Sequence, residues 1–221
     1  MENIANTTES RETAGILLSK RLTEFKLSNS VVVGVPHGGA CVAAAIARQL
    51  NLPLEVMMCR KIKDPRDPSK TIGSVSASDV IMHDCDHSIP QDYLYFESIR
   101  LRNEIRYEQD FYYGSDQQPP LEFKTVILVD DILRTPDTLL ACIQEIRKMR
   151  ALKVVVAVPF VEAEAARVIQ TESDQLIFLK LQQHIQSPHE YYRDFPEVKE
   201  WAVRDLLRRG TIKINSGHIN L

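Results

Sequence analysis

Two adjacent aspartates, Asp130 and Asp131, follow the apolar segment Thr125–Val129 and are the residues of this chain best suited to chemistry. A strand this apolar is buried, and burying an unpaired carboxylate at its end is costly, so each aspartate needs hydrogen-bond donors. The two vicinal hydroxyls of a ribose would supply them, because each carboxylate accepts hydrogen bonds. Amide groups of the surrounding loop would satisfy the same carboxylates. The residues alone leave both interpretations open.

A few residues later the segment Thr135–Thr138 begins a predicted helix. Phosphate groups bind at helix N-termini, where free N–H groups and the helix dipole favour negative charge. The same residues also make a good structural cap. Thr135 suits the N-cap position, Pro136 the first helical position, and Asp137 complements the dipole. A phosphate site and a simple helix cap are both compatible with this segment.

Two further loops carry candidate functional groups. The turn Pro36–Gly39 follows the β-branched segment Ser30–Val35, and its two glycines permit close approach of the backbone to a ligand. The segment Arg60–Ile72 is too polar to be core, and we expect it to be a mobile basic loop. Its cations either bind an anion or are simply solvated: Lys61, Lys63, Arg66 and Lys70.

Strand-like and helix-like segments alternate along almost the whole chain. The predicted strands are Ser30–Val35, Leu54–Cys59, Thr125–Val129, Lys153–Val158 and Gln175–Leu179, with Gly73–Asp84 as a strand or β-hairpin. The predicted helices are Thr8–Phe25, Ala40–Leu50, Tyr93–Tyr113, Pro136–Met149, Glu162–Gln170 and Pro196–Arg209. Continuous runs of Val, Ile and Leu are typical of parallel strands buried on both faces. The sequence therefore predicts a three-layer α/β/α fold with a mainly parallel central sheet, and ligands bind such sheets at the carboxyl ends of the strands.

The charge, the apolar runs and the cysteine spacing of the chain argue against several classes of function. The formal net charge of -3 argues against non-specific nucleic-acid or membrane-surface binding. Residues 1–11 lack the apolar stretch of a secretory signal, and no apolar run is long enough to span a bilayer. The four cysteines show neither metal-type nor disulfide-type spacing, which favours a reducing compartment and a cytoplasmic protein.

A cluster of possible metal ligands, His83, Asp84, Asp86 and His87, lies in a loop-like segment. Its spacing matches no familiar metal site, so we expect no metal ion held mainly by the protein. No composition break divides the chain, and we expect a single domain over residues 1–221, with an N-terminal capping helix in residues 1–27.

The segment from Thr125 to Thr138 resembles the phosphoribosyl-pyrophosphate motif of type I phosphoribosyltransferases: an apolar strand, Asp-Asp, three residues, Thr, a gap and Thr. Other parts of the chain resemble a poorly characterised branch of predicted phosphoribosyltransferases. They are Gly34–Gly39 as the pyrophosphate loop, Cys59–Lys61 with Ile72–Ser74 as the second strand and catalytic loop, Ala157–Pro159, and Tyr191–Phe195.

The resemblance implies a transferase that moves the ribosyl 5-phosphate of phosphoribosyl pyrophosphate to a nitrogenous acceptor, a nucleobase by analogy, in nucleotide metabolism. Asp130 and Asp131 would bind the ribose hydroxyls, and Lys61 with the mobile loop would close over the reacting centre. Mg²⁺ would be bound mainly through the ligand's pyrophosphate. The remaining ligand-binding residues would be Arg134, Thr135, Asp137 and Thr138 around the 5′-phosphate, Pro36, His37, Gly38 and Gly39 at the pyrophosphate, and Arg60.

The family forms a hood over the acceptor beyond its last strand, which corresponds here to residues 180–221 with the C-terminal helix. Candidate acceptor contacts there are His184, His189, Tyr191 and Tyr192, although packing or surface roles fit them as well. Dimers are common in the resembling family, so a homodimer is an expectation too.

Three residues depart from the family pattern: His37, Pro136 and Asp137. Proline removes one N–H donor, and a hydrogen bond to a charged group is worth about 1.5–3 kcal/mol. An acid close to the phosphate adds a repulsion of roughly 1 kcal/mol in water, and a neutral histidine donates fewer hydrogen bonds than arginine. These departures keep open a non-catalytic protein that binds phosphoribosyl pyrophosphate or a nucleotide for regulation. A hydrolase with Asp130 as nucleophile is a weaker third hypothesis.

Overall fold

The apolar segments predicted as strands form one parallel sheet in the computed structural model, which describes residues 8–82, 89–114 and 118–210. Its central strands are β1 (Ser30–Gly34), β6 (Thr125–Val129) and β8 (Lys153–Glu162). The flanking strands are β2 (Leu54–Val56), β7 (Ile132–Leu133) and β9 (Gln175–Gln182). The order is β2-β1-β6-β8-β7, and β9 also pairs with β8. Every pairing in this sheet is parallel, which confirms the prediction.

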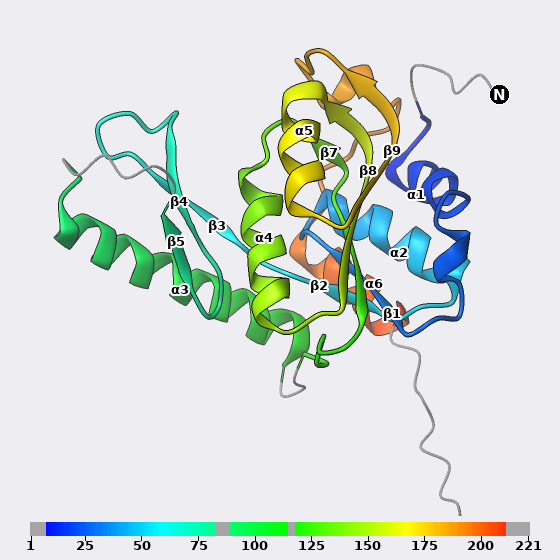
Figure 1. Ribbon diagram of the computed structural model, residues 1–221, viewed down its shortest axis with the longest axis horizontal. Coiled ribbons are helices and arrows are strands. Elements are labelled where there is room, and N and C mark those ends of the chain that lie inside the picture. Colours follow the sequence, from blue (N-terminus) through cyan, green and yellow to red (C-terminus); the bar gives the residue numbers. More distant parts are fainter. Residues whose placement is uncertain (1–7, 83–88, 115–117, 211–221) are drawn as a thin grey trace, which may run out of the picture.

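Successive side chains of the central strands enter two separate cores. Val32 and Ile127 pack with helices α1 (Arg11–Ser19), α2 (Gly38–Leu50) and α6 (Glu200–Gly210). Val31 and Val33 pack with α4 (Asp137–Lys148) and α5 (Ala163–Glu172) on the opposite face. Figure 1 shows the two groups of helices on either side of the sheet. The fold is therefore the predicted three-layer α/β/α arrangement, because both faces of a parallel sheet must be covered.

A second, antiparallel sheet corrects the prediction for Arg60–Ile72. This segment is not simply a mobile loop: β3 (Arg60–Lys63) and β4 (Thr71–Val75) pair as a hairpin, and β5 (Val80–Met82) completes the sheet. Ile62 and Ile72 are buried and supply the apolar contacts that the many charged residues conceal in the sequence. The hairpin expected within Gly73–Asp84 is present as β4 and β5.

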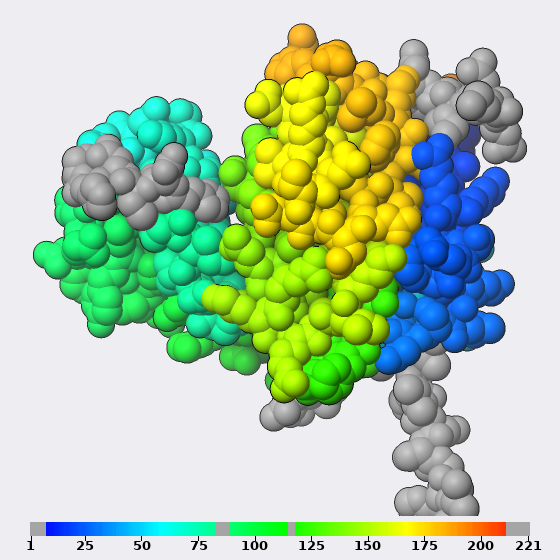
Figure 2. Space-filling view, in the orientation of Figure 1, coloured from blue at the N-terminus to red at the C-terminus, as the bar shows by residue number. Residues whose placement is uncertain are grey.

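These three strands and helix α3 (Gln91–Tyr113) form a side lobe, the cyan-to-green part of Figures 1 and 2. The side lobe is attached to α4 through the buried Glu145, whose carboxylate accepts hydrogen bonds of 2.7 Å from Ser76 and of 2.7 and 2.8 Å from Ser78. This attachment determines where β3 presents its basic side chains.

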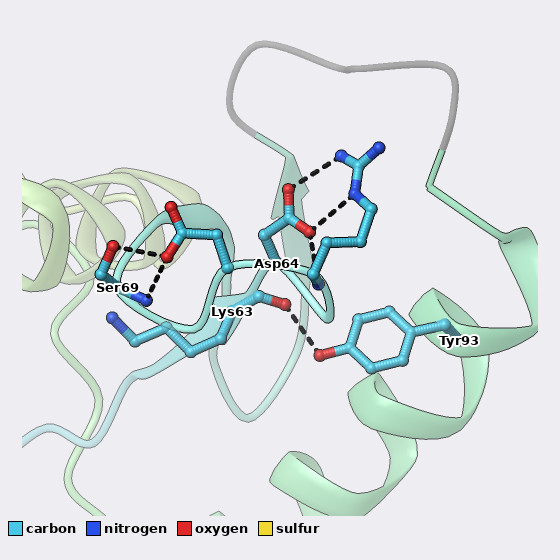
Figure 3. Close-up of polar contacts among 6 residues, drawn as sticks. Lys63, Asp64, Ser69 and Tyr93 are labelled. Atoms are coloured by element: carbon cyan, nitrogen blue, oxygen red, sulfur yellow. Dashed lines mark hydrogen bonds and ion pairs between the residues drawn. The ribbon is translucent and has the colours of Figure 1, made fainter.

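The turn between β3 and β4 is closed by its own acidic residues (Figure 3). Asp64 accepts hydrogen bonds from the Arg66 amide (2.9 Å) and guanidinium (2.9 and 3.1 Å), which lower the Asp64 pKa to about 2. Ser69 donates to Asp67 from its hydroxyl (2.6 Å) and amide (3.1 Å), and Tyr93 of α3 donates to the Lys63 carbonyl (2.7 Å). The cation of Arg66 is thus directed at its own turn.

Two predicted helices differ from the observed elements in extent. The predicted Thr8–Phe25 helix divides into α1 and a 3-10 turn, Thr23–Phe25. The predicted Pro196–Arg209 helix begins at Glu200, after a 3-10 turn at Pro188–Glu190. None of the helices within the described residues is both long and apolar enough to cross a membrane.

Candidate active site

The turn after β1 and the two aspartates after β6 meet because these strands are parallel neighbours in register. Gly34 pairs with Val129 at the last position of both strands, and the Val35 amide donates to the Val129 carbonyl at 2.8 Å. Two segments about 95 residues apart in sequence therefore end at the same point of the sheet edge. This is where ligands bind parallel sheets.

Both glycines of the turn lie directly against the aspartates. A Cβ placed on Gly38 would be 1.8 Å from Asp131 Oδ2, and one on Gly39 would be 2.9 Å from the Val129 carbonyl oxygen and 3.0 Å from Asp130 Oδ1. No side chain fits at either position. The requirement for glycine here comes from close approach between two loops.

His37 precedes these glycines in an unusual backbone conformation. Its φ is 68° and its ψ is -114°, and the exposed imidazole does not cap α2, which begins at Gly38. A positive φ in a non-glycine residue costs about 1–3 kcal/mol and persists only where the surroundings impose it. Such strain is concentrated at ligand-binding turns, which fits the predicted pyrophosphate loop.

Asp131 is held from several sides and is only 9% exposed. The Arg11 guanidinium donates from Nε to Asp131 Oδ2 at 2.7 Å. The Tyr192 hydroxyl donates to the Asp131 backbone carbonyl at 2.7 Å, and burial raises the Tyr192 pKa, so this donor remains protonated. The charge and the backbone of Asp131 are both fixed before any ligand arrives.

Asp130 has a different environment. Its Oδ1 accepts the Asp131 amide at 2.8 Å, which is the self-satisfied loop contact considered above. Desolvation, reinforced by the neighbouring Asp131 charge, raises the pKa of Asp130 well above its ordinary value. The residue remains partly accessible, so a ligand hydroxyl or cation can still reach it.

In the predicted phosphate segment, the helix begins one residue later than expected. Helix α4 begins at Asp137, and Pro136 rather than Thr135 is its N-cap, without a side-chain cap. The prediction that Thr135 caps the helix is wrong, because the short strand β7 pairs with β8 and moves the entry into α4. The Leu140 amide makes the first helical bond, to Pro136, so the amides of Asp137 and Thr138 precede the helical hydrogen bonds.

Lys61 reaches this segment from the side lobe. Its ammonium donates to Thr135 Oγ1 at 3.0 Å and to Asp137 Oδ2 at 3.1 Å. The predicted catalytic lysine and the predicted phosphate loop therefore lie together. Lys61 also pairs with the carboxylate of Asp137, the residue whose negative charge opposes a phosphate there.

Two other predicted ligand-binding cations are not directed at this group. Arg60 pairs with Glu108 of α3, and Arg134 is exposed, with no hydrogen bond or ion pair to the described part of the chain. Pro36 is buried at the start of the turn.

The predicted acceptor residues have separate surroundings. Tyr191 and Tyr192 are buried against Phe160, with ring centroids 4.9 and 5.2 Å away, and form a small core. His184 is exposed, with Nδ1 3.6 Å from Glu162 Oε2, and His189 contacts the Phe195 ring edge-on. The cluster His83, Asp84, Asp86 and His87 lies outside the described residues.

Sequence reasoning missed Arg11. A usable signal was present: Arg11 shares the buried face of α1 with Ala14 and Leu18, at spacings of three and seven residues. A cation on an apolar helix face requires a partner inside the protein. Nothing in the sequence says that this partner is Asp131, 120 residues away.

A hollow of about 970 Å³ opens beside His37 and Gly38 of the turn, and neither aspartate is among its lining residues. Its wall includes Arg11, His37 and Gly38 on one side and Phe195, Lys199 and Trp201 on the other. The hollow is large enough for a drug-sized ligand. Buried charge, a strained turn and open volume thus occur together at the carboxyl ends of β1 and β6.

Comparison with known proteins agrees with this arrangement. A family model described as a phosphoribosyl transferase domain matches residues 1–194. Two proteins from two strains of Mycobacterium tuberculosis, each named "Putative phosphoribosyl transferase", are 28% identical over 206 residues. The match takes in 91% of this chain but 46% of theirs, so the chain spans about half the length of these relatives.

Solved structures share the fold. The crystal structure of TT1426 from Thermus thermophilus superposes with a TM-score of 0.82 at 28% identity, over 93% of this chain and 99% of that one. The AQ2163 protein from Aquifex aeolicus gives a TM-score of 0.50 at 14% identity, over 94% and 90% of the two chains, and is similar in fold alone.

Proposed function

Because the chain belongs to the phosphoribosyl transferase domain family, we propose that it transfers the ribosyl 5-phosphate group of phosphoribosyl pyrophosphate to a nitrogenous acceptor and releases pyrophosphate. The contact between the Gly38–Gly39 turn and Asp130–Asp131 carries this proposal. It joins a backbone suited to the pyrophosphate to carboxylates suited to the ribose.

The ribose hydroxyls would bind to Asp130 and Asp131. Arg11 donates to Asp131 Oδ2, the Asp131 amide donates to Asp130 Oδ1, and the two side chains also hydrogen-bond to each other. A sugar would replace the contact between the two carboxyl groups, so that each would accept one hydroxyl of a vicinal diol.

The 5′-phosphate would bind at the start of α4, to the amides and hydroxyls of Thr135, Asp137 and Thr138. Lys61 already lies there, 3.0 Å from Thr135 Oγ1. On binding, its ammonium would exchange the Asp137 carboxylate for ligand oxygens, which offsets part of the charge that Asp137 contributes.

Mg²⁺ would be held mainly by the oxygens of the pyrophosphate. This ion prefers six oxygen ligands and retains several waters, so few protein ligands are needed when the ligand provides oxygens. When bound, it supplies charge neutralisation for the departing pyrophosphate.

The chain's own residues would act mainly by orientation and electrostatics. The N–H groups of His37, Gly38 and Gly39 would stabilise the charge that develops on the leaving pyrophosphate. The aspartates would hold the ribose as its anomeric carbon becomes cationic. The side lobe would exclude water, which would otherwise hydrolyse that carbon.

A second candidate function is binding without turnover, in a regulatory protein on the same fold. His37, Pro136 and the pairing of Asp137 with Lys61 favour it, because each weakens the positive potential offered to phosphates. Arg60, which pairs with Glu108, adds to this argument.

Isothermal titration with phosphoribosyl pyrophosphate and Mg²⁺ tests the binding that both candidates share. We expect saturable binding to the wild type and loss of at least about ten-fold in affinity for Asp130→Asn, where the carboxylate that would accept a ribose hydroxyl cannot form. Asp205→Asn, an exposed acid on α6, is the matched control. Absence of binding by the folded wild type would refute the proposal.

Pyrophosphate release across purine, pyrimidine and pyridine acceptors then separates the two candidates. Release with any acceptor establishes the transferase. Binding without release under every condition favours the regulatory protein.

A further inference from the structure

The buried cation Arg11 has no part in the roles assigned above, although three different groups hold it in place. It projects from the first turn of α1 and is 9% exposed. Besides its 2.7 Å bond to Asp131, it donates from Nη1 to the Pro196 carbonyl at 2.8 Å. Its guanidinium carbon lies 3.6 Å from the centroid of the Phe195 ring.

These contacts fix the guanidinium in position and orientation. The ion pair sets its distance from the carboxylate, the carbonyl sets its rotation, and the aromatic ring covers one face of its plane. Phe195 in turn stacks on Tyr192, with ring centroids 5.2 Å apart, and Tyr192 donates to the backbone of Asp131. Arg11 thus holds the side chain of Asp131, and Tyr192 holds its main chain.

Two distant parts of the chain are joined to make this support. The Thr8 amide donates to the Tyr191 carbonyl at 2.8 Å, and the Arg193 amide donates to the Thr8 carbonyl at 3.0 Å. The Asp194 amide donates to the Glu9 carbonyl at 2.9 Å. The backbone before α1 is therefore locked to residues 191–194, and Arg11 and Phe195 follow directly on the two sides of that connection.

The position of Asp131 shows what the support achieves. Gly38 leaves no space on one side of Oδ2, and Arg11 holds the same atom, so the carboxylate cannot rotate. Arg11 engages Oδ2 alone and leaves Oδ1 to other partners. A stabilising role alone is a weaker explanation, because a buried ion pair adds little net stability compared with well-packed apolar side chains.

We propose that Arg11 is a positioning residue for ribose recognition: it fixes Asp131 so that one carboxylate oxygen faces the sugar, and residues 191–196 hold Arg11 in place for that purpose. This inference rests on the proposed function. It makes the terminal segments of the domain part of the ribose site, because they position a residue that would bind the sugar.

The test compares ligands with and without a ribose. Binding of phosphoribosyl pyrophosphate, ribose 5-phosphate and inorganic pyrophosphate, each with Mg²⁺, is measured for wild type, Arg11→Gln and Arg11→Lys. Arg11→Gln is expected to bind both ribose ligands about 10- to 100-fold more weakly, the equivalent of one hydrogen bond between charged groups. Arg11→Lys is expected to recover only part of this, because lysine keeps the charge but lacks the planar fork.

Affinity for inorganic pyrophosphate is expected to stay within about two-fold of wild type, because that ligand does not use Asp131 for a sugar. A purely structural role would reduce all three affinities together, and this result would overturn the proposal. Arg48→Gln, which removes an exposed pair with Glu12, is the matched control and leaves all three unchanged.

Phe195→Leu keeps the ion pair and removes the aromatic support, so it serves if Arg11→Gln does not fold. It is expected to weaken ribose ligands selectively, and wild-type affinity would overturn the proposal. If wild type binds phosphoribosyl pyrophosphate and the Arg11 variants bind it equally well, only this inference fails. If wild type does not bind it, the proposed function itself fails.

Discussion

At one end of the loop after β6, Asp131 is 9% exposed, paired with Arg11 and pressed against Gly38. At the other end, Thr135 is exposed and its hydroxyl, with the carboxylate of Asp137, binds only the side chain of Lys61 among the described residues. We call these the ribose side and the phosphate side. The ribose side is rigid because every contact comes from the body of the fold.

The phosphate side depends on a lysine carried by a separate sheet. Lys61 lies on β3 of the side lobe, and its partners lie on the main domain. An ion pair that is partly exposed to solvent is worth about 0–1 kcal/mol, so a phosphate can replace Asp137 as the partner of Lys61 at little cost in free energy. One half of the proposed site is therefore preorganised, and we expect the other half to rearrange when a ligand binds.

The largest expected effect comes from breaking the rigid side with Gly38→Ala. The new methyl carbon would lie 1.8 Å from Asp131 Oδ2, which cannot move away from Arg11. We expect affinity for phosphoribosyl pyrophosphate to fall by about 100-fold or more, with a loss of about 1–3 kcal/mol in unfolding free energy from the forced overlap. Titration calorimetry and thermal denaturation measure the two effects.

The double variant Gly38→Ala, Asp131→Ala is the comparison. It removes the overlap with Oδ2, but it leaves the buried Arg11 without its carboxylate, so neither the affinity nor the stability is expected to return. Wild-type binding by the single variant would contradict the described contact between the turn and Asp131.

A smaller effect of opposite sign is expected on the phosphate side for Asp137→Asn. This change removes a carboxylate that both occupies Lys61 and repels a phosphate. A repulsion of roughly 1 kcal/mol at about 4 Å in water corresponds to about five-fold tighter binding of ribose 5-phosphate. Lys61→Met is expected to weaken the same binding, because it removes the cation.

Asp205→Asn changes the net charge equally at a distant site and controls for long-range effects. Weaker binding by Asp137→Asn would show that Asp137 positions Lys61 instead of competing with the ligand.

The smallest expected effect is a pH dependence of stability that arises on the ribose side, at Asp130. The raised pKa of Asp130 means that the folded protein keeps a proton there that the unfolded chain has lost. Stability attributable to this group therefore falls as pH rises from about 4 through the folded pKa, with a slope of at most about 1.4 kcal/mol per pH unit. Asp130→Asn is expected to melt higher than wild type at pH 7–8 and equally at pH 4.

Glu55 must be removed from this comparison, because burial raises its pKa to about 7 and produces a similar fall between its ordinary pKa of 4.5 and that value. Thermal denaturation profiles are therefore compared with and without Asp130→Asn in a Glu55→Gln background. A difference in melting temperature that stays constant across the pH range would show that Asp130 does not titrate there.

Much of the fold and part of the site could be predicted from the sequence. The strands β1, β6 and β8 have local signals, because a strand buried on both faces must be apolar throughout. For the same reason Asp130, Asp131 and the Pro36–Gly39 turn were expected at one edge of the sheet, where the structure brings them into contact. Their roles with a ligand stay predictions.

The β3–β4 hairpin escaped prediction because its signal is weak. Within residues 60–72, only Ile62 and Ile72 are strongly apolar and buried, and Asp64 and Asp67 accept hydrogen bonds from within their own turn. The first residue of α4 escaped because the pairing of β7 with β8 decided it.

Local hydrophobic patterns and the geometry of parallel sheets were enough to predict the three-layer architecture and the position of the candidate site. Which charges meet was decided by tertiary packing alone. Arg11 and Asp131 are 120 residues apart, and Lys61 and Asp137 are 76 apart. Side-chain pairing over such separations depends on how helices and sheets pack, and no local pattern encodes it.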